Sequence, residues 1–139
     1  MSEMVQLCTF QLDERTFALP VAAVREVLRP PRLTAVPLAP PEVVGVANLR
    51  GQIVPVLDLR VRLALEARRP AAHVLILRVG DATFGVLVDS VGDVVEVERA
   101  AFEPVPEHVV LERAELLSGA FKLPDRLLLV LFVDKILRG

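Results

Sequence analysis

The stretch VVGVANLRGQIVPVLDLR, from Val43 to Arg60, is almost wholly apolar except at its middle. There Asn48 and Arg50 interrupt two runs that have the composition of buried strands, and Gly51 follows them. Glycine adopts the positive φ that tight turns require, so the stretch predicts two strands joined by a turn. An arginine on that turn is lifted away from the apolar strands. Its planar guanidinium group then suits a carboxylate on another surface.

Three more pairs of apolar segments flank short turn signals. VQLCTFQL and TFALP surround Asp13–Arg15, HVLILRV and ATFGVLV surround Gly80-Asp81, and LLSGAFKL and RLLLVLFV surround Pro124-Asp125. Each pair predicts a β-hairpin. Eleven prolines and seven glycines punctuate the chain at short intervals, which is typical of an all-β sandwich or barrel. The segment VAAVREVL, residues 21–28, is expected to begin as a helical turn and to continue as a strand.

Two segments of the first half of the chain are similar in sequence to two segments of the second half. FALPVAAVREVL from Phe17 aligns with FGVLVDSVGDVV from Phe84, and GVANLRGQIVPVLDLRVRL from Gly45 aligns with GAFKLPDRLLLVLFVDKIL from Gly119. Two copies of one unit predict two similar small barrels, each too small to be comfortably stable alone. Chance similarity among valine-rich strands is the alternative.

The alignment bears on Arg50. Where the first copy has Leu49–Gln52, the second has LPDR, residues 123–126, which is an ordinary turn. The turn is therefore structural, and the arginine is what distinguishes the first copy. Arg50 either faces a partner or pairs internally with Glu26 or Asp58, and the residues alone leave both alternatives open.

Composition argues against several classes of function. At 139 residues the chain is one domain, or two very small ones that share a core. A net charge of −2 and the absence of Tyr and Trp disfavour nucleic-acid binding. Cys8, the single cysteine, is expected to be a core residue. Uncharged runs reach nine residues, against the about 18 needed to span a bilayer, and no export signal is visible. We therefore expect a soluble cytoplasmic protein without direct membrane insertion.

Catalytic signatures are not found. His73 and His108 have no ligand at metal-binding spacing, and the glycines form neither a phosphate loop nor a dinucleotide fingerprint. Asp89 and Asp93 could form a carboxylate pair, but VDSVGDVVEV is interpreted as a strand edge with solvated acids. We expect no enzyme, cofactor or metal. A binding module remains, for which the rigid TAVPLAPPEVVG, residues 34–45, offers either a recognition surface or a loop that covers the core.

These segments together resemble the chemotaxis coupling protein family, CheW. The resemblance is carried by the order of FALPVAAVREVLR, then VPLAPPEVVGVANLRGQIVPVLDLRVRL, then FGVLVDSVGDVVEV, which spans nearly the whole chain. It implies an all-β fold of two intertwined five-stranded barrels of SH3 type with short helical segments, one of them from about Asp58 to Leu65. It implies one CheW-like domain over 1–139, with subdomain 1 at roughly 15–72 and subdomain 2 at roughly 73–139. The resemblance also allows an exchange of the N-terminal strand between them.

The resemblance also implies the function. Members of the family are non-catalytic adaptors that bridge the cytoplasmic tip of methyl-accepting chemoreceptors to the regulatory domain of the chemotaxis histidine kinase, in arrays at the inner face of the cell membrane. By resemblance the first subdomain faces the kinase, and a groove between the subdomains takes the receptor. The residues that match the family's functional motif are expected to bind partners: Val24, Glu26, Val27, Gly45, Asn48, Leu49, Arg50, Gly51, Gly85, Val88, Asp89 and Gly119.

Two departures from the family pattern stand out. Ala47 replaces a customary isoleucine, and Phe132 stands where an aspartate is common, which weakens the assignment of contacts in the second subdomain. A coupler of another chemosensory pathway, serving surface motility or gene regulation, is an alternative that shares the same contacts. A stand-alone barrel that binds a small ligand is a further alternative.

Overall fold

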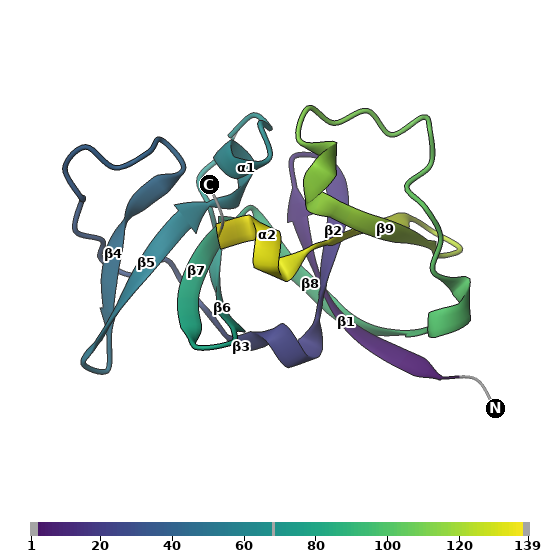
Figure 1. Ribbon diagram of the computed structural model, residues 1–139, viewed down its shortest axis with the longest axis horizontal. Coiled ribbons are helices and arrows are strands. Elements are labelled where there is room, and N and C mark those ends of the chain that lie inside the picture. The colour runs from purple at the N-terminus through teal and green to yellow at the C-terminus, as the bar shows by residue number, and fades with distance from the viewer. Residues whose placement is uncertain (1–2, 68, 138–139) are drawn as a thin grey trace.

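The computed structural model describes residues 3–67 and 69–137, which form ten strands and several short helical segments (Figure 1). The strands are β1 Met4–Leu12, β2 Arg15–Pro20, β3 Val24–Leu28, β4 Val43–Leu49, β5 Gln52–Asp58, β6 His73–Val79, β7 Ala82–Val88, β8 Ser90–Glu98, β9 Leu117–Lys122 and β10 Leu127–Leu131. The helical segments are η1 Val21–Ala23, α1 Leu59–Arg62, η2 Arg99–Ala101, η3 Ala114–Leu116 and α2 Val133–Leu137. The all-β class and the short helical segments are confirmed.

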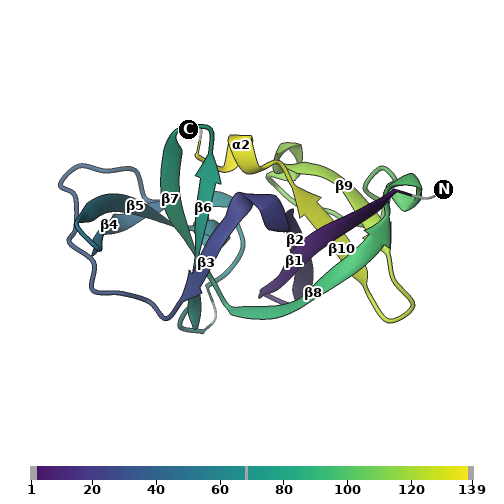
Figure 2. The ribbon, with the colours of Figure 1, turned by 90° about the horizontal axis from the view of Figure 1, so that it is seen from below.

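The strands form two five-stranded sheets that lie side by side as two lobes (Figures 1 and 2). Barrel 1 has the strand order β3-β6-β7-β5-β4, and barrel 2 has the order β8-β1-β2-β10-β9. In each sheet, chain that follows one edge strand bridges to the other edge strand. Thr34 pairs with Val46 of β4, and Glu103 pairs with Ala120 of β9. Both sheets are thereby curled toward closure, which removes open strand edges.

The internal repeat predicted from the sequence is present in the register of the sheets. Each barrel holds one parallel pair of strands, in which Val56 lies opposite Gly85 in barrel 1 and Val130 lies opposite Ala18 in barrel 2. These two pairs are equivalent in the alignment of the copies. A shift in the strand register also occurs at equivalent residues of the hairpins β4–β5 and β9–β10. Chance similarity does not produce matched registers, so we retain the repeat.

The hairpins are exchanged between the copies. The β1–β2 hairpin of the first copy completes barrel 2, and the β6–β7 hairpin of the second copy completes barrel 1. The expected boundary near residue 73 therefore differs from the boundary between the sheets. Barrel 1 takes its strands from residues 24–88, and barrel 2 takes them from residues 4–20 and 90–131. The difference arises because each hairpin pairs in parallel with a strand distant in sequence, so that a whole hairpin is exchanged and not the first strand alone.

The hydrophobic core lies both inside each barrel and between the barrels, because the central strands are buried on both faces. One face of each strand lines its own barrel, with Val74 and Ile76 in barrel 1 and Leu128 and Val130 in barrel 2. The other face packs between the barrels, where leucines and phenylalanines of both sheets form the largest cluster: Phe10, Phe17, Leu19, Leu57, Leu75, Leu77, Phe84, Leu129 and Leu131, among others. This arrangement explains why HVLILRV and RLLLVLFV are continuously apolar and do not alternate.

The local predictions are also confirmed. Residues 21–28 begin as the 3₁₀ turn η1 and continue as β3. The turns at Asp13 and Gly80, at equivalent places in the two copies, each have a φ of 58°. The helix expected from about Asp58 to Leu65 is shorter, because α1 ends at Arg62, and Ala64 then adopts a φ of 58°. Cys8 is buried.

Candidate functional site

The β4–β5 turn presents Arg50 at the end of barrel 1. The two residues between the strands, Arg50 and Gly51, have φ values of 50° and 87°, the positive pair that a type I′ hairpin turn requires. The side-chain oxygen Oδ1 of Asn48 accepts a hydrogen bond of 2.9 Å from the Gly51 N–H and thereby fixes the turn. The amide and the glycine of the opening stretch thus build the turn, and the arginine is the part that projects from it.

Arg50 makes an ion pair with Glu26 of β3 across the end of the barrel. Its Nη2 lies 2.6 Å from Oε2 of Glu26, and the side chains are 73% and 29% exposed. The hydrogen bond to Glu26, more than the charge itself, raises the pKa of the Arg50 guanidinium. Of the two internal partners that the sequence left open, Glu26 is the one used. The guanidinium group stays largely open to solvent, so the pair leaves most of its hydrogen-bonding edge available.

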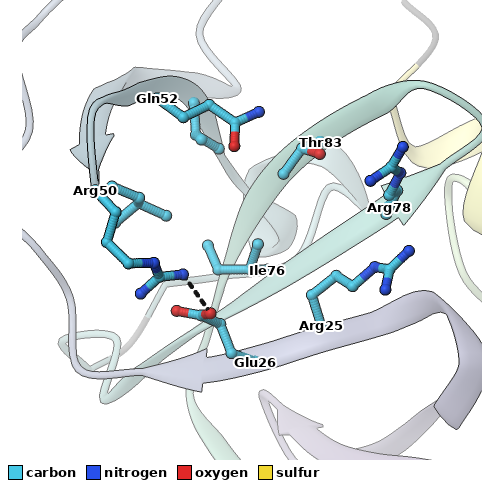
Figure 3. Close-up of a pocket in the computed structure, with 9 residues that line it drawn as sticks. Arg25, Glu26, Arg50, Gln52, Ile76, Arg78 and Thr83 are labelled. Atoms are coloured by element: carbon cyan, nitrogen blue, oxygen red, sulfur yellow. Dashed lines mark hydrogen bonds and ion pairs between the residues drawn. The ribbon is translucent and has the colours of Figure 1, made fainter.

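The pair forms one wall of a recess of about 440 Å³ at this end of barrel 1 (Figure 3). Leu49, Val54 and Ile76 supply apolar surface inside it. The remaining lining residues are polar: Arg25, Glu26, Arg50, Gln52, Arg78 and Thr83. Three of the predicted site residues, Glu26, Leu49 and Arg50, are therefore brought together from β3 and the β4–β5 hairpin.

Other predicted residues of barrel 1 lie near this end or support it. Val27 follows Glu26 on β3 and is 42% exposed, whereas Val24 is half-buried. Gly45 is buried, and a Cβ built there would lie 2.6 Å from the carbonyl oxygen of Thr34. That approach is too close for any side chain, so Gly45 allows the bridge that closes barrel 1 and does not itself offer a surface.

Three predicted residues of the later motifs are buried in the packing and do not form a surface for a partner. Val88 has no exposed area and belongs to the cluster between the barrels. A Cβ at Gly85 would lie 2.9 Å from Cγ1 of Val74, and one at Gly119 would lie 2.3 Å from the ring of Phe102. We therefore correct the expectation for Gly85, Val88 and Gly119: they match the motif because of close packing.

Asp89 requires a correction too, because it was interpreted as one of the solvated acids of a strand edge. It is 6% exposed, and its Oδ1 lies 3.1 Å from Nη1 of Arg60. Its Oδ2 accepts a 2.8 Å hydrogen bond from the N–H of Asp13, in the turn between β1 and β2. Asp89 stands where the chain crosses from β7 of barrel 1 to β8 of barrel 2, so this carboxylate ties the two lobes together. Asp93, by contrast, is exposed on β8.

Arg60, the cation that pairs with Asp89 and Asp58, was not identified from the sequence. Asp58 caps α1 by accepting from the N–H of Arg60, and it also holds the Arg60 side chain through Nε and Nη2, each at 3.0 Å. The hydrogen bond to Asp58 is the largest cause that raises the pKa of Arg60. The signal was present in the segment DLR, since an aspartate before a short helix predicts a cap. Asp58 is thus paired with Arg60, and it ends β5 at the opposite end of the strand from the turn that carries Arg50.

Arg62 joins the lobes at a second point. Its Nε and Nη2 donate 2.8 Å hydrogen bonds to the carbonyl oxygens of Ile136 and Lys135, at the end of α2. Burial lowers the pKa of Arg62, and the nearby charge of Arg113 lowers it further. Figure 1 shows α2 lying between the two barrels, so this contact links the helix that follows β5 of barrel 1 to the helix that follows β10 of barrel 2.

Among residues 3–67 and 69–137, no group of three His, Cys, Asp or Glu side chains is placed to hold a metal ion. None of the helices described there is long and apolar enough to cross a lipid bilayer.

Comparison with known proteins gives a consistent family. A model of the CheW-like domain matches residues 6–139. The chain is 30% identical over 138 residues to the chemotaxis protein CheW of Helicobacter pylori, covering 98% of this chain and 83% of that protein. It is 32% identical over 130 residues to the chemotaxis protein CheW of Klebsiella aerogenes, covering 92% and 78%.

A solved structure agrees with the sequence comparison. The crystal structure of scaffolding protein TtCheW from Thermoanaerobacter tengcongensis superimposes with a TM-score of 0.88 and 25% identity, covering 100% of this chain and 94% of that chain. The likeness therefore includes both barrels and the exchange of hairpins between them. The chain belongs to the CheW-like domain family.

Proposed function

We propose that this protein is a non-catalytic adaptor that couples chemoreceptors to the chemotaxis histidine kinase in signalling arrays at the inner face of the cell membrane. The single observation that carries the proposal is the match to the CheW-like domain over residues 6–139, with relatives named as chemotaxis proteins. An adaptor of this kind acts by position: it holds receptor and kinase in a fixed geometry, so that the state of one biases the other.

The end of barrel 1 is the surface we propose for the kinase. Glu26, Val27, Asn48, Arg50 and Gly51 stand at or near the β4–β5 turn, and all but the half-buried Glu26 are exposed. The rigid turn holds Arg50 in place, which lowers the entropy that a contact with a partner would cost. A contact made by these few residues is expected to have a modest affinity, which suits an array that assembles from repeated weak links.

The resemblance gives the receptor a groove between the subdomains. In place of that groove we propose an apolar recess of about 360 Å³ on barrel 2, beside η1, the segment that leads from β2 of barrel 2 to β3 of barrel 1. It is lined by Val5, Leu7, Pro20, Phe102, Phe121 and Val130, with Arg99 at its edge. Phe102 is 43% exposed there, and Met4 nearby is 47% exposed. An apolar recess of this kind suits the apolar face of a helix.

The proposal is tested by reconstituting kinase and receptor-containing membranes with and without the purified protein. We expect the protein to bind both partners and to raise kinase activity. Absence of binding to either partner would refute the proposal.

The contribution of Arg50 is tested separately by a charge swap. Arg50→Glu should reduce kinase stimulation while leaving the melting temperature within a few degrees, since an exposed pair contributes about 0–1 kcal/mol. The double variant Glu26→Arg/Arg50→Glu restores the internal pair in reverse. If Arg50 faces the kinase, the double variant stays defective; recovery of stimulation would mean that the pair serves only the barrel itself. Arg29→Glu, an exposed arginine that does not line the recess, is the matched control.

A further inference from the structure

The recess at the end of barrel 1 carries an excess of positive charge that its internal pair does not neutralise. Arg25, Arg50 and Arg78 line it, and Glu26 is the one carboxylate among its described lining residues. Glu26 already accepts from Arg50 at 2.6 Å. Arg25 and Arg78 therefore face the recess with no carboxylate bonded to either in the described part of the chain.

The sheet register explains why these two arginines are neighbours. Val24 pairs with Leu77 and Glu26 pairs with Ile76, so Arg25 is the extra residue of an irregularity in β3, opposite the step between Ile76 and Leu77 and next to Arg78 along β6. Arg78 in turn pairs with Thr83 of β7. Figure 3 shows the side chains of Arg25 and Arg78 on the side of the recess opposite the Arg50–Glu26 pair.

The donors on these arginines are mostly available. Arg78 uses Nε for a 3.0 Å hydrogen bond to the carbonyl oxygen of Gly80, which steadies the side chain and leaves its outer nitrogens for another acceptor. Arg25 makes no hydrogen bond or ion pair with its side chain in the described part of the chain and is exposed. Two like charges side by side repel each other, and a carboxylate placed between them would relieve the repulsion and accept from both.

We propose that this recess receives an acidic side chain, aspartate or glutamate, from a loop of the protein partner, with its carboxylate between Arg25 and Arg78. The half-buried Leu49, beside the buried Val54 and Ile76, distinguishes this occupant from a free inorganic anion, because its apolar surface suits an aliphatic residue next to the acid. The identification of that partner as the kinase rests on the proposed function; the acidic and aliphatic chemistry of the occupant does not.

The first test uses a peptide probe and needs no kinase. Titrating the isotope-labelled protein with acetyl-Leu-Glu-Leu-amide should shift the backbone amide resonances of Gln52, Ile76 and Thr83, and acetyl-Leu-Gln-Leu-amide should shift them much less. In Arg25→Ala/Arg78→Ala the response to the acidic peptide should fall at least about threefold, whereas Arg29→Ala should respond like the parent protein. Equal shifts from both peptides, or shifts centred elsewhere, would overturn the proposal. Equally large shifts from inorganic phosphate would also overturn it, since they would indicate a general anion site.

The second test concerns the partner. Arg25→Glu/Arg78→Glu should weaken binding to the kinase regulatory domain at least about tenfold in low salt. The difference in affinity between this variant and the parent protein should become smaller as the salt concentration is raised. Unchanged affinity in the double variant would overturn the assignment of the recess to the kinase. If the parent protein does not bind the kinase at all, the proposed function fails, while the peptide titration still decides whether the recess takes an acidic side chain.

Discussion

Replacing Asp89 by alanine should destabilise the fold, although the sequence pattern made this residue look like a surface acid. Its carboxylate bonds to Arg60 on one side and to the N–H of Asp13 on the other, and it is 6% exposed. Both contacts would disappear together. The substitution thus removes a connection between barrel 1, which holds Arg60, and the β1–β2 hairpin of barrel 2.

The size of the effect follows from what each partner retains. Arg60 keeps the two oxygens of Asp58 and the carbonyl oxygen of Arg69, so its charge is not left unpaired. The loss is then the charge-assisted hydrogen bond to Arg60 and the hydrogen bond from the N–H of Asp13, which together suggest about 2–4 kcal/mol. Replacing Arg60 by methionine should cost more, about 3–5 kcal/mol, because two poorly exposed carboxylates would lose their cation.

Urea denaturation of Asp89→Ala, with Asp93→Ala as the control, measures the difference. Asp93 lies four residues further on and is exposed, so its substitution should change the free energy of unfolding by no more than about 0.5 kcal/mol. Hydrogen exchange at the Asp13 amide should also accelerate in Asp89→Ala. A loss below about 1 kcal/mol, with normal protection of that amide, would mean that the carboxylate network does not hold the lobes together.

Two further predictions test the core. Leu129→Ala should cost about 2–5 kcal/mol in urea denaturation, because the side chain is 2% exposed in the cluster between the barrels, whereas Leu38→Ala, at a fully exposed position, should change little; equal effects would contradict the placement of β10. The thiol of Cys8 should react with iodoacetamide at pH 8 only as fast as the protein unfolds, because burial raises its pKa and shields it. Rapid labelling of the native protein, followed by mass spectrometry, would contradict this.

Much of the fold was predictable because its turns carry explicit signals. Asp13 and Gly80 hold the same positive φ at equivalent places, and both residue types tolerate it. The repeat was visible because equivalent positions pack alike. The exchange of hairpins between the barrels was not visible, since the parallel pair β2–β10 joins residues that are far apart in sequence, and no local pattern states which strand a hairpin will adjoin.

The site was predictable only in part, for a similar reason. The turn at Arg50 follows from local residues, and Glu26 was one of two candidate partners. The position of Asp89 depends on Arg60, 29 residues earlier, and burial of a carboxylate cannot be inferred before its cation is placed. Arg25 and Arg78 are likewise neighbours only through the pairing of β3 with β6. These contacts depend on which distant strands pair and in what register, and no local segment of the sequence states this.

Folding stability alone gives little reason for an arginine at the β4–β5 turn. Arg50 adopts a φ of 50°, which costs a residue other than glycine or asparagine about 1–2 kcal/mol. Its exposed pair with Glu26 returns about 0–1 kcal/mol, which does not exceed that cost. Barrel 2 closes the equivalent hairpin with Pro124 in the place of Arg50, in a turn without positive φ, and it has Asp93 where barrel 1 has Glu26. The equivalent hairpin ends of this pseudo-symmetric molecule therefore differ in charge and in turn conformation. Unlike ends are what an adaptor requires if it is to hold two different partners and not two copies of one.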